Sequence, residues 1–146
     1  MQALDGARIS IGAIAAGLAE QAMTIAKNYA NERTAFGKPI GKFEGIQFKF
    51  ADMSAEIRAM ELMTYDTARM KAEGKRHTLE AAQTKLFAGT RCTQICLECQ
   101  QVLGGNGYSK EYHVERFVRD AKLLEIGEGT NEILRMLIGG TVLAQK

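Results

Sequence analysis

The chain contains little proline, no tryptophan and few strand-favouring runs, and each shortage reduces the number of protein classes to which it can belong. A single proline among 146 residues leaves room for long helices, so helix is the expected state. No apolar run approaches the roughly 20 residues that span a bilayer, and no signal-peptide pattern opens the chain. The formal net charge of +2 is too small to indicate a nucleic-acid or membrane-surface partner. We therefore expect a soluble, intracellular protein.

Cysteine is also scarce. Cys92, Cys96 and Cys99 follow a spacing that places them along one face of a helix. A metal site would need a fourth ligand, and neither His77 nor His113 is nearby in the sequence. Three thiols on one helix cannot form an ordinary disulfide framework. We expect no metal site, and three reduced, mostly buried side chains.

The residues that are present describe a globular domain. Apolar residues make up 46% of the chain and charged residues 25%. One domain of 146 residues can bury roughly two thirds of the surface that its unfolded chain exposes. There is no repeat, low-complexity segment or linker. We expect residues 1–146 to form a single domain.

Apolar residues recur at helical spacing in three long segments. We expect the first helix from an N-cap at Asp5 to about residue 31, the second over 45–73 and the third over 78–103. Glycines, with the only proline, break the pattern between them. A short amphipathic segment, 114–121, and a last helix after residue 130 follow. These segments predict an all-α, antiparallel up-and-down bundle of about four helices, completed by the last one.

The second helix carries two apolar stripes, so we expect much of its circumference to be buried. One stripe comprises Ile46, Phe50, Met53, Ile57, Met60 and Thr64. The other comprises Phe48, Ala51, Ala55, Ala59 and Leu62.

A lone carboxylate, Glu128, lies between Gly127 and Gly129, just before a helical run that starts near Thr130. The glycines permit unusual backbone angles and leave the side chain uncrowded. The free N–H groups at the start of the next helix can meet an anion or a cofactor. Such a carboxylate suits proton abstraction beside a carbonyl, and the alternative is an ordinary solvated turn.

Two further segments allow two interpretations each. In residues 104–108, Gly-Gly-Asn-Gly-Tyr, backbone amides can approach a flavin or a phosphate, or the segment is a helix C-cap and turn. It does not lie between a strand and a helix, so it is neither a dinucleotide fingerprint nor a P-loop. Arg33 beside Phe36 suits a diphosphate clamp, or only an interaction with the end of its own helix.

Taken together, these segments resemble the C-terminal helical domain of the acyl-CoA dehydrogenase family, over about Leu4 to Gly140. Several ordered blocks at family-like spacing carry the resemblance, which makes it far more specific than any single motif. The blocks are Leu4-Asp5-Gly6-Ala7-Arg8, Glu32-Arg33-Thr34-Ala35-Phe36-Gly37-Lys38-Pro39-Ile40, Phe48 with Ala51-Asp52-Met53, Gln101-Val102-Leu103-Gly104-Gly105-Asn106-Gly107-Tyr108, Val114-Glu115-Arg116 with Arg119-Asp120-Ala121-Lys122, and Gly127-Glu128-Gly129-Thr130-Asn131-Glu132-Ile133.

The resemblance implies an oxidoreductase that converts acyl-CoA to 2,3-enoyl-CoA in fatty acid metabolism. FAD accepts the hydride, and an electron-transfer flavoprotein then receives the electrons. Glu128 matches the base that removes the α-proton, and Gly129 lies beside the substrate. Asp5 and Arg8 match positions near the bound acyl-CoA.

The resemblance also implies which residues meet FAD. Arg33 matches a residue that reaches the FAD pyrophosphate, and Phe36 another that contacts FAD. A loop that touches FAD across a subunit interface matches Gln101, Val102, Leu103, Gly104 and Gly105. The start of the last helix, which also meets FAD, matches Thr130, Asn131 and Glu132.

Family members precede this region with an N-terminal helical domain and a central β-domain. We therefore expect a fragment that is inactive by itself, binds FAD weakly or not at all, and forms a homo-oligomer, a dimer or a tetramer. The expected location is cytoplasmic, or the mitochondrial matrix in a eukaryote. Two alternatives are a non-catalytic helical oligomerisation domain and a fragment of an acyl-CoA oxidase.

Overall fold

Helices account for most of the computed structural model, which describes residues 2–144. The all-α prediction is confirmed. The helices are α1 (Gln2–Glu32), α2 (Glu44–Ala72), α3 (Thr78–Leu103), α4 (Gly105–Tyr108), α5 (Val114–Ile126) and α6 (Asn131–Ala144). The bounds of α3 are those expected from the sequence.

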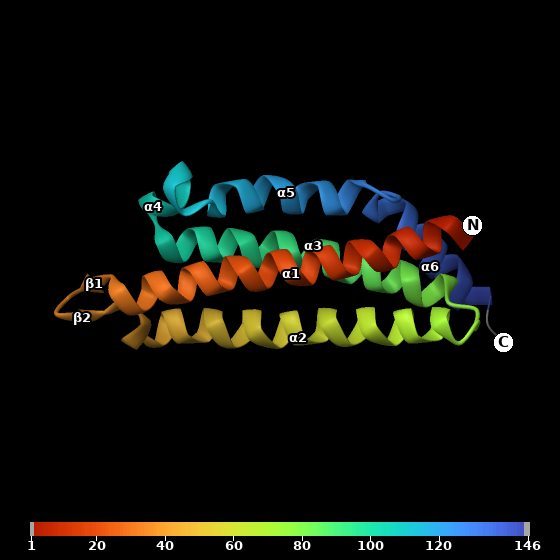
Figure 1. Cartoon of the computed structure of the whole chain (residues 1–146), viewed down its shortest axis with the longest axis horizontal. Helices are drawn as coiled ribbons and strands as arrows, with labels where there is room; N and C mark the ends of the chain where they lie inside the picture. The colour runs from red at the N-terminus through yellow and green to blue at the C-terminus, as the bar shows by residue number, and fades with distance from the viewer. Residues whose placement is uncertain (1, 145–146) are drawn as a thin grey trace.

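Four of these helices form an antiparallel bundle in which α1, α2, α3 and α5 alternate in direction (Figure 1). Helix α3 is central, because it packs against α1, α2, α5 and α6. The expectation that the last helix completes the bundle is wrong. Helix α5 continues to Ile126 and occupies the fourth position, whereas α6 lies at the end of the bundle where α1 and α3 begin (Figure 1).

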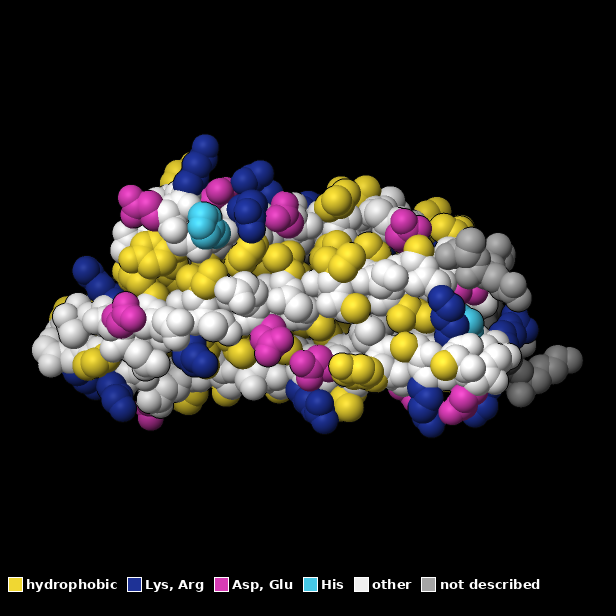
Figure 2. Space-filling model, in the orientation of Figure 1, with side chains coloured by type: hydrophobic (Ala, Val, Ile, Leu, Met, Phe, Trp, Pro, Cys, Tyr) yellow, Lys and Arg dark blue, Asp and Glu magenta, His cyan; other side chains and the backbone are white. Residues whose placement is uncertain are grey.

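Small side chains on α1 form much of the core. They are fully or almost fully buried at Ala15, Ala19, Ala22, Ala26 and Ala30, and they bring the α1 backbone close to its neighbours. Figure 2 shows further apolar side chains gathered along the furrow between α1 and α5. The bundle is therefore held by close helix contacts around α3.

The same residues make α1 more apolar than expected. By length and composition alone, the helix over Leu4–Glu32 could cross a membrane, so the expectation that no segment qualifies is wrong. Alanine, together with Ile9, Ile11, Ile14 and Leu18, raises the hydropathy of this helix. In the fold, α1 packs against α2, α3 and α5.

Helix α2 differs from its prediction in burial. Met53, Ile57 and Met60 of the first stripe are buried, but the second stripe faces outward, with Phe48 62% and Leu62 52% exposed. The reason is position: α2 is an outer helix that packs against α1 and α3 on one side. An apolar face thus remains open along α2.

Asp5 is not the N-cap of α1, because the helix begins at Gln2 and Asp5 lies inside it. Its carboxylate is buried and bonds to side chains instead of the free N–H groups of a helix start. A buried aspartate with side-chain partners resembles an N-cap in sequence, because both leave aspartate just before an apolar run.

The three cysteines are buried on α3, as predicted, and are free thiols. Burial raises the pKa of the Cys99 thiol to about 12. The Cys99 thiol therefore stays protonated, and all three buried cysteines act as core side chains.

The end of the bundle opposite the start of α1 carries two of the connections, the one between α1 and α2 and the one between α3 and α5. Between α1 and α2, β1 (Thr34–Ala35) pairs antiparallel with β2 (Lys38–Pro39) in a small hairpin, and the 3-10 helix η1 (Ile40–Lys42) follows. After α3, the expected loop contains the single turn α4, and a second 3-10 helix, η2 (Lys110–Tyr112), leads into α5. Both connections lie at the same end of the molecule (Figure 1).

Candidate functional site

The predicted site residues form two groups at opposite ends of the bundle. The glutamate end comprises Asp5, Arg8, Glu128, Gly129, Thr130, Asn131 and Glu132. The hairpin end comprises Arg33, Phe36, Gln101, Val102, Leu103, Gly104 and Gly105. Helix α1 joins the two ends, and its rise of 1.5 Å per residue separates Asp5 from Arg33 by roughly 40 Å.

Glu128 occupies an unusual backbone conformation in the turn between α5 and α6. Its φ is 57°, in the left-handed region, and Gly129 follows with a φ of 104°. A non-glycine residue there costs on the order of 1 kcal/mol, so surrounding contacts have to hold it. The side chain of Glu128 is exposed, and among residues 2–144 only its backbone oxygen is hydrogen-bonded. The turn therefore presents a carboxylate that the fold does not engage.

Arg8 holds the turn from α1. Its Nε donates to the backbone oxygen of Glu128 at 3.3 Å, and its Nη1 donates to Asp5 Oδ1 at 3.2 Å. The other carboxylate oxygen of Asp5 accepts from Thr78 Oγ1 at 2.8 Å. Asp5 and Arg8 are 2% and 4% exposed, so this ion pair is buried. It links α1, the first residue of α3 and the glutamate turn.

Lys85 holds the turn from α3. Its Nζ donates to the backbone oxygens of Glu125 at 3.1 Å and Gly129 at 2.7 Å, and to Asn131 Oδ1 at 3.4 Å. The side chain is completely buried. Burial lowers the pKa of Lys85 below its usual value, and the nearby charge of Glu125 opposes that shift. Lys85 is thus a buried cation that contacts both sides of Glu128.

The start of α6 is tied to α3 and α5. Asn131 Nδ2 donates to Thr90 Oγ1 at 3.2 Å and to Glu125 Oε2 at 3.4 Å. Thr130 Oγ1 caps the helix by accepting the backbone N–H of Ile133 at 3.5 Å. The side chain of Asn131 thus points into the protein, whereas Glu132 is exposed.

Charges near the turn are stabilised locally. Burial alone would raise the pKa of Glu125, but hydrogen bonds from Thr93 and Lys122, and the charges of Lys122 and Lys85, outweigh it and lower that pKa. The pKa of Glu132 is lowered by its own backbone N–H and by the Thr130 hydroxyl. Both carboxylates are therefore ionised at neutral pH.

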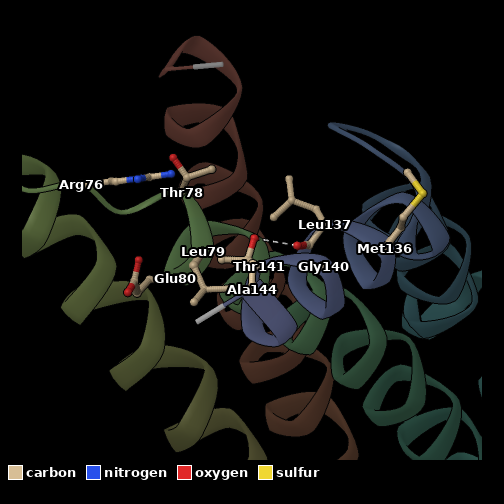
Figure 3. Close-up of a pocket in the computed structure, with 9 residues that line it drawn as sticks. All are labelled: Arg76, Thr78, Leu79, Glu80, Met136, Leu137, Gly140, Thr141 and Ala144. Carbon is tan, nitrogen blue, oxygen red and sulfur yellow. Dashed lines mark hydrogen bonds between the residues drawn. The ribbon is translucent and has the colours of Figure 1, made fainter. Parts of the chain in front are cut away.

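A hollow of about 740 Å³ adjoins the glutamate end, between the start of α3 and α6 (Figure 3). Thr78, which bonds to Asp5, is one of its wall residues. Figure 3 shows Arg76 and Glu80 on one side and the α6 residues on the other. The residues that line it are Arg76, Thr78, Leu79, Glu80, Met136, Leu137, Gly140, Thr141 and Ala144. An apolar wall with charges at one side can hold a chain-like ligand with a polar end.

The hairpin end is more open. Arg33 lines a hollow of about 370 Å³ together with Val102, Leu103, Gly104 and Gly105. The backbone at Gly104 and Gly105 is exposed, whereas the side chains of Val102 and Leu103 are buried. The structure thus brings Arg33 and the glycine loop together.

Phe36 lies at the tip of the hairpin and is 95% exposed. Its φ of 52° is in the left-handed region, which suits the two-residue turn that it forms with Gly37. The ring forms a T-shaped pair with Phe43, with centroids 6.2 Å apart. Gln101 is also exposed. The hairpin end therefore leaves these side chains exposed.

Comparison with known proteins identifies this arrangement. The family model described as "Acyl-CoA dehydrogenase, C-terminal domain" matches residues 1–143. The chain belongs to the acyl-CoA dehydrogenase family. The resemblance inferred from the ordered sequence blocks is thereby confirmed.

Similar proteins carry acyl-CoA dehydrogenase names. A probable acyl-CoA dehydrogenase of Bacillus subtilis, YngJ, is 50% identical over 96% of this chain and 37% of its own. The butyryl-CoA dehydrogenase structure from Megasphaera elsdenii superposes with a TM-score of 0.96 at 45% identity, over 98% of this chain and 37% of that one. The structure of a Mycobacterium smegmatis glutaryl-CoA dehydrogenase in complex with FADH2 superposes with a TM-score of 0.93 at 27% identity, over 97% of this chain and 37% of that one. The chain therefore spans about 37% of the length of these acyl-CoA dehydrogenases.

Sequence reasoning missed Lys85 and Thr78 as parts of the glutamate end. The available signal was a lysine on the core face of α3, close to the buried Ala81, Ala82 and Ala88. A lysine is almost never fully buried unless it has partners, so this position indicates a polar contact.

Proposed function

We propose that this chain supplies the C-terminal helical domain of an FAD-dependent acyl-CoA dehydrogenase, in which Glu128 removes the α-proton of the acyl-CoA thioester. The observation that carries the proposal is the exposed carboxylate of Glu128 on a turn whose backbone Arg8 and Lys85 hold. A base needs a defined direction and an unobstructed carboxylate, and this turn combines both.

The adjacent hollow supports the assignment of the substrate side. Charged side chains, Arg76 and Glu80, lie near one side of the hollow. Its apolar wall comprises Leu79, Leu137 and Ala144. Asp5 and Arg8, matched to positions near acyl-CoA, lie next to Thr78 at its edge. Because Asp5 and Arg8 are buried, we propose that they shape the substrate site by fixing the turn.

Residues at both ends fit FAD. Arg33 and the exposed backbone of Gly104 and Gly105 share one hollow, and a guanidinium beside free backbone amides suits a diphosphate. Thr130 and Glu132 lie beside Glu128, at the start of α6. When bound, FAD supplies the acceptor for the hydrogen that leaves the β-carbon. An electron-transfer flavoprotein is the proposed next acceptor.

The distance between the two ends supports a homo-oligomer. One extended FAD molecule does not reach from Arg33 to Glu128, because α1 separates these ends by roughly 40 Å. We propose that the hairpin end of one copy meets the flavin that serves Glu128 of another copy. Such a pairing is mutual in a two-fold dimer, so two copies complete two sites.

A hybrid enzyme tests the assignment of Glu128. Residues 1–143 of this chain replace the matching C-terminal part of the Megasphaera elsdenii butyryl-CoA dehydrogenase. We expect Glu128→Gln to lower kcat roughly 10²- to 10⁴-fold, because the general base is lost, and to preserve acyl-CoA binding. The rate at which added substrate bleaches the flavin absorbance measures the loss of activity. Titration calorimetry measures acyl-CoA binding.

Glu111→Gln is the matched control, since Glu111 is an exposed glutamate of η2 at the other end of the bundle. It should leave both quantities unchanged. Unchanged turnover of the Glu128→Gln enzyme would show that another residue is the base. A purified 146-residue chain with stoichiometric flavin absorbance would contradict the proposed need for the rest of the enzyme.

A further inference from the structure

We infer that Lys85 is a positioning residue, a buried ammonium that fixes the direction in which the Glu128 carboxylate leaves the fold. Its three acceptors are Glu125 O, Gly129 O and Asn131 Oδ1, at 3.1, 2.7 and 3.4 Å. One acceptor precedes Glu128 and two follow it. Lys85 therefore holds both flanks of the turn without touching the carboxylate. Its kinetic consequence rests on the proposed role of Glu128 as base.

The number of donors matches the number of acceptors. A protonated lysine has three N–H donors, and a neutral amine has two. Lys85 is completely buried, so water does not replace a missing partner. The charged form alone satisfies all three oxygens, and each of them would lose its contact if the ammonium were removed.

Lys85 also takes the place of a helix C-cap. Glu125 O belongs to the last turn of α5, whose final carbonyls have no partner within the helix. A positive charge at that position interacts favourably with the negative end of the helix dipole. The left-handed position after the C-cap, which is usually glycine, is occupied here by Glu128, with a φ of 57°. The lysine thus determines where the helix stops and the turn starts.

The turn needs such support, because Glu128 is a non-glycine residue with a φ of 57°. Arg8 engages the Glu128 oxygen from α1, and Lys85 engages the Gly129 oxygen from α3. Two cations on two helices therefore hold two successive carbonyls. This fixes the backbone and leaves the side chain of Glu128 free to meet a substrate.

A merely structural lysine would stabilise the core without controlling the turn, and variants distinguish the two roles. Lys85→Met keeps much of the side-chain length and removes every donor. Lys85→Gln keeps two N–H donors and provides a second variant if the methionine protein does not fold. Ile95→Ala is the control, because Ile95 is 1% exposed on the same helix in the core of the bundle.

The first measurement uses the 146-residue chain itself. In Lys85→Met we expect at least a tenfold loss of amide-exchange protection at residues 127–131, relative to the loss elsewhere. The backbone chemical shifts of Glu128 should also show that this residue no longer has left-handed backbone angles. Ile95→Ala should lower amide-exchange protection without an additional loss at residues 127–131. The loss at these residues in Lys85→Gln should lie between those in Ile95→Ala and Lys85→Met. A turn with unchanged shifts and protection in both Lys85 variants would overturn the inference.

The second measurement uses the hybrid enzyme. We expect Lys85→Met to lower kcat on the order of 100-fold with KM within about threefold, because a small misplacement of a base is costly. In a Glu128→Gln background the same substitution should have almost no further effect, because Lys85 acts through Glu128. A full additional loss in that background would overturn the inference. If Glu128→Gln alone left turnover unchanged, the proposed function would fail, while the exchange experiment would still decide the role of Lys85.

Discussion

The glutamate end and the hairpin end carry the same kind of predicted residue but are built in opposite ways. At the glutamate end, Asp5, Arg8, Lys85 and Asn131 are buried and hydrogen-bonded to one another or to the turn. At the hairpin end, Arg33 and Gln101 are exposed and Phe36 is 95% exposed. The supporting side chains of the glutamate end have their partners within this chain, whereas the side chains of the hairpin end are exposed.

The difference fits the two tasks proposed for the ends, proton abstraction at one and cofactor binding at the other. A reacting group must keep its position to within a fraction of an ångström, so its supports belong in the core. A surface that receives a cofactor from outside the chain needs accessible donors and an aromatic ring, which cost little to leave in water. We therefore expect substitutions to affect folding stability at the glutamate end and cofactor retention at the hairpin end.

The largest effect on stability is expected from Arg8→Ala. Removal of Arg8 leaves the buried Asp5 carboxylate with Thr78 as its remaining partner, and breaking a buried ion pair in this way costs about 3–5 kcal/mol. Urea unfolding of the chain measures the free energy of unfolding. Arg135→Ala, which removes an exposed pair with Glu132, is the control and should change it by no more than about 1 kcal/mol. Equal effects of the two substitutions would contradict the contrast between the ends.

A moderate effect is expected from Gly89→Ala. A Cβ at Gly89 would lie 2.8 Å from the backbone oxygen of Leu124, so α5 would have to move away from α3 just before the glutamate turn. Such overpacking costs about 1–3 kcal/mol. Gly17→Ala is the control, because its Cβ meets nothing within 4 Å, and helix propensity should stabilise that variant by up to about 1 kcal/mol. Thermal unfolding should show shifts of opposite sign, and a stabilised Gly89→Ala protein would refute the close contact.

The smallest effect on stability is expected at the hairpin end. Arg33→Ala and Phe36→Ala should change the free energy of unfolding by less than about 0.5 kcal/mol, because both side chains are exposed. In the hybrid enzyme the same substitutions should lower the amount of flavin retained per chain after gel filtration. Full flavin retention in both variants would remove the hairpin end from the cofactor site.

Much of the helical layout could be predicted from the sequence, because its signals are local. The third helix was predicted to begin near Thr78 and to run to Leu103, as it does, since Gly104 and Gly105 stop a clear helical period. The role of α5 in the bundle was missed, because residues 122–126 read as a connection and the expected helix was too short. The outward stripe of α2 was misjudged, because periodicity reports which residues are apolar, not how many neighbours a helix has.

The site was predictable in its exposed residues and less so in its buried ones. Glu128 stands out because it lies between two glycines, and Arg33 because an aromatic residue, Phe36, lies three positions after it. Asp5 was misread as a cap, and Lys85 was missed altogether. Its partners lie at least 40 positions away, and no local pattern reports such contacts.

Helix α1 sets a fixed length between the two ends. It runs without a break from Gln2 to Glu32, with Arg8 near one end and Arg33 just beyond the other. Each residue added to such a helix would advance one end by 1.5 Å and turn it by about 100° relative to the other. In the proposed oligomer, the spacing of neighbouring flavins would then follow from the number of residues in α1. Between these two arginines the length of α1 is therefore constrained as well as its buried alanines.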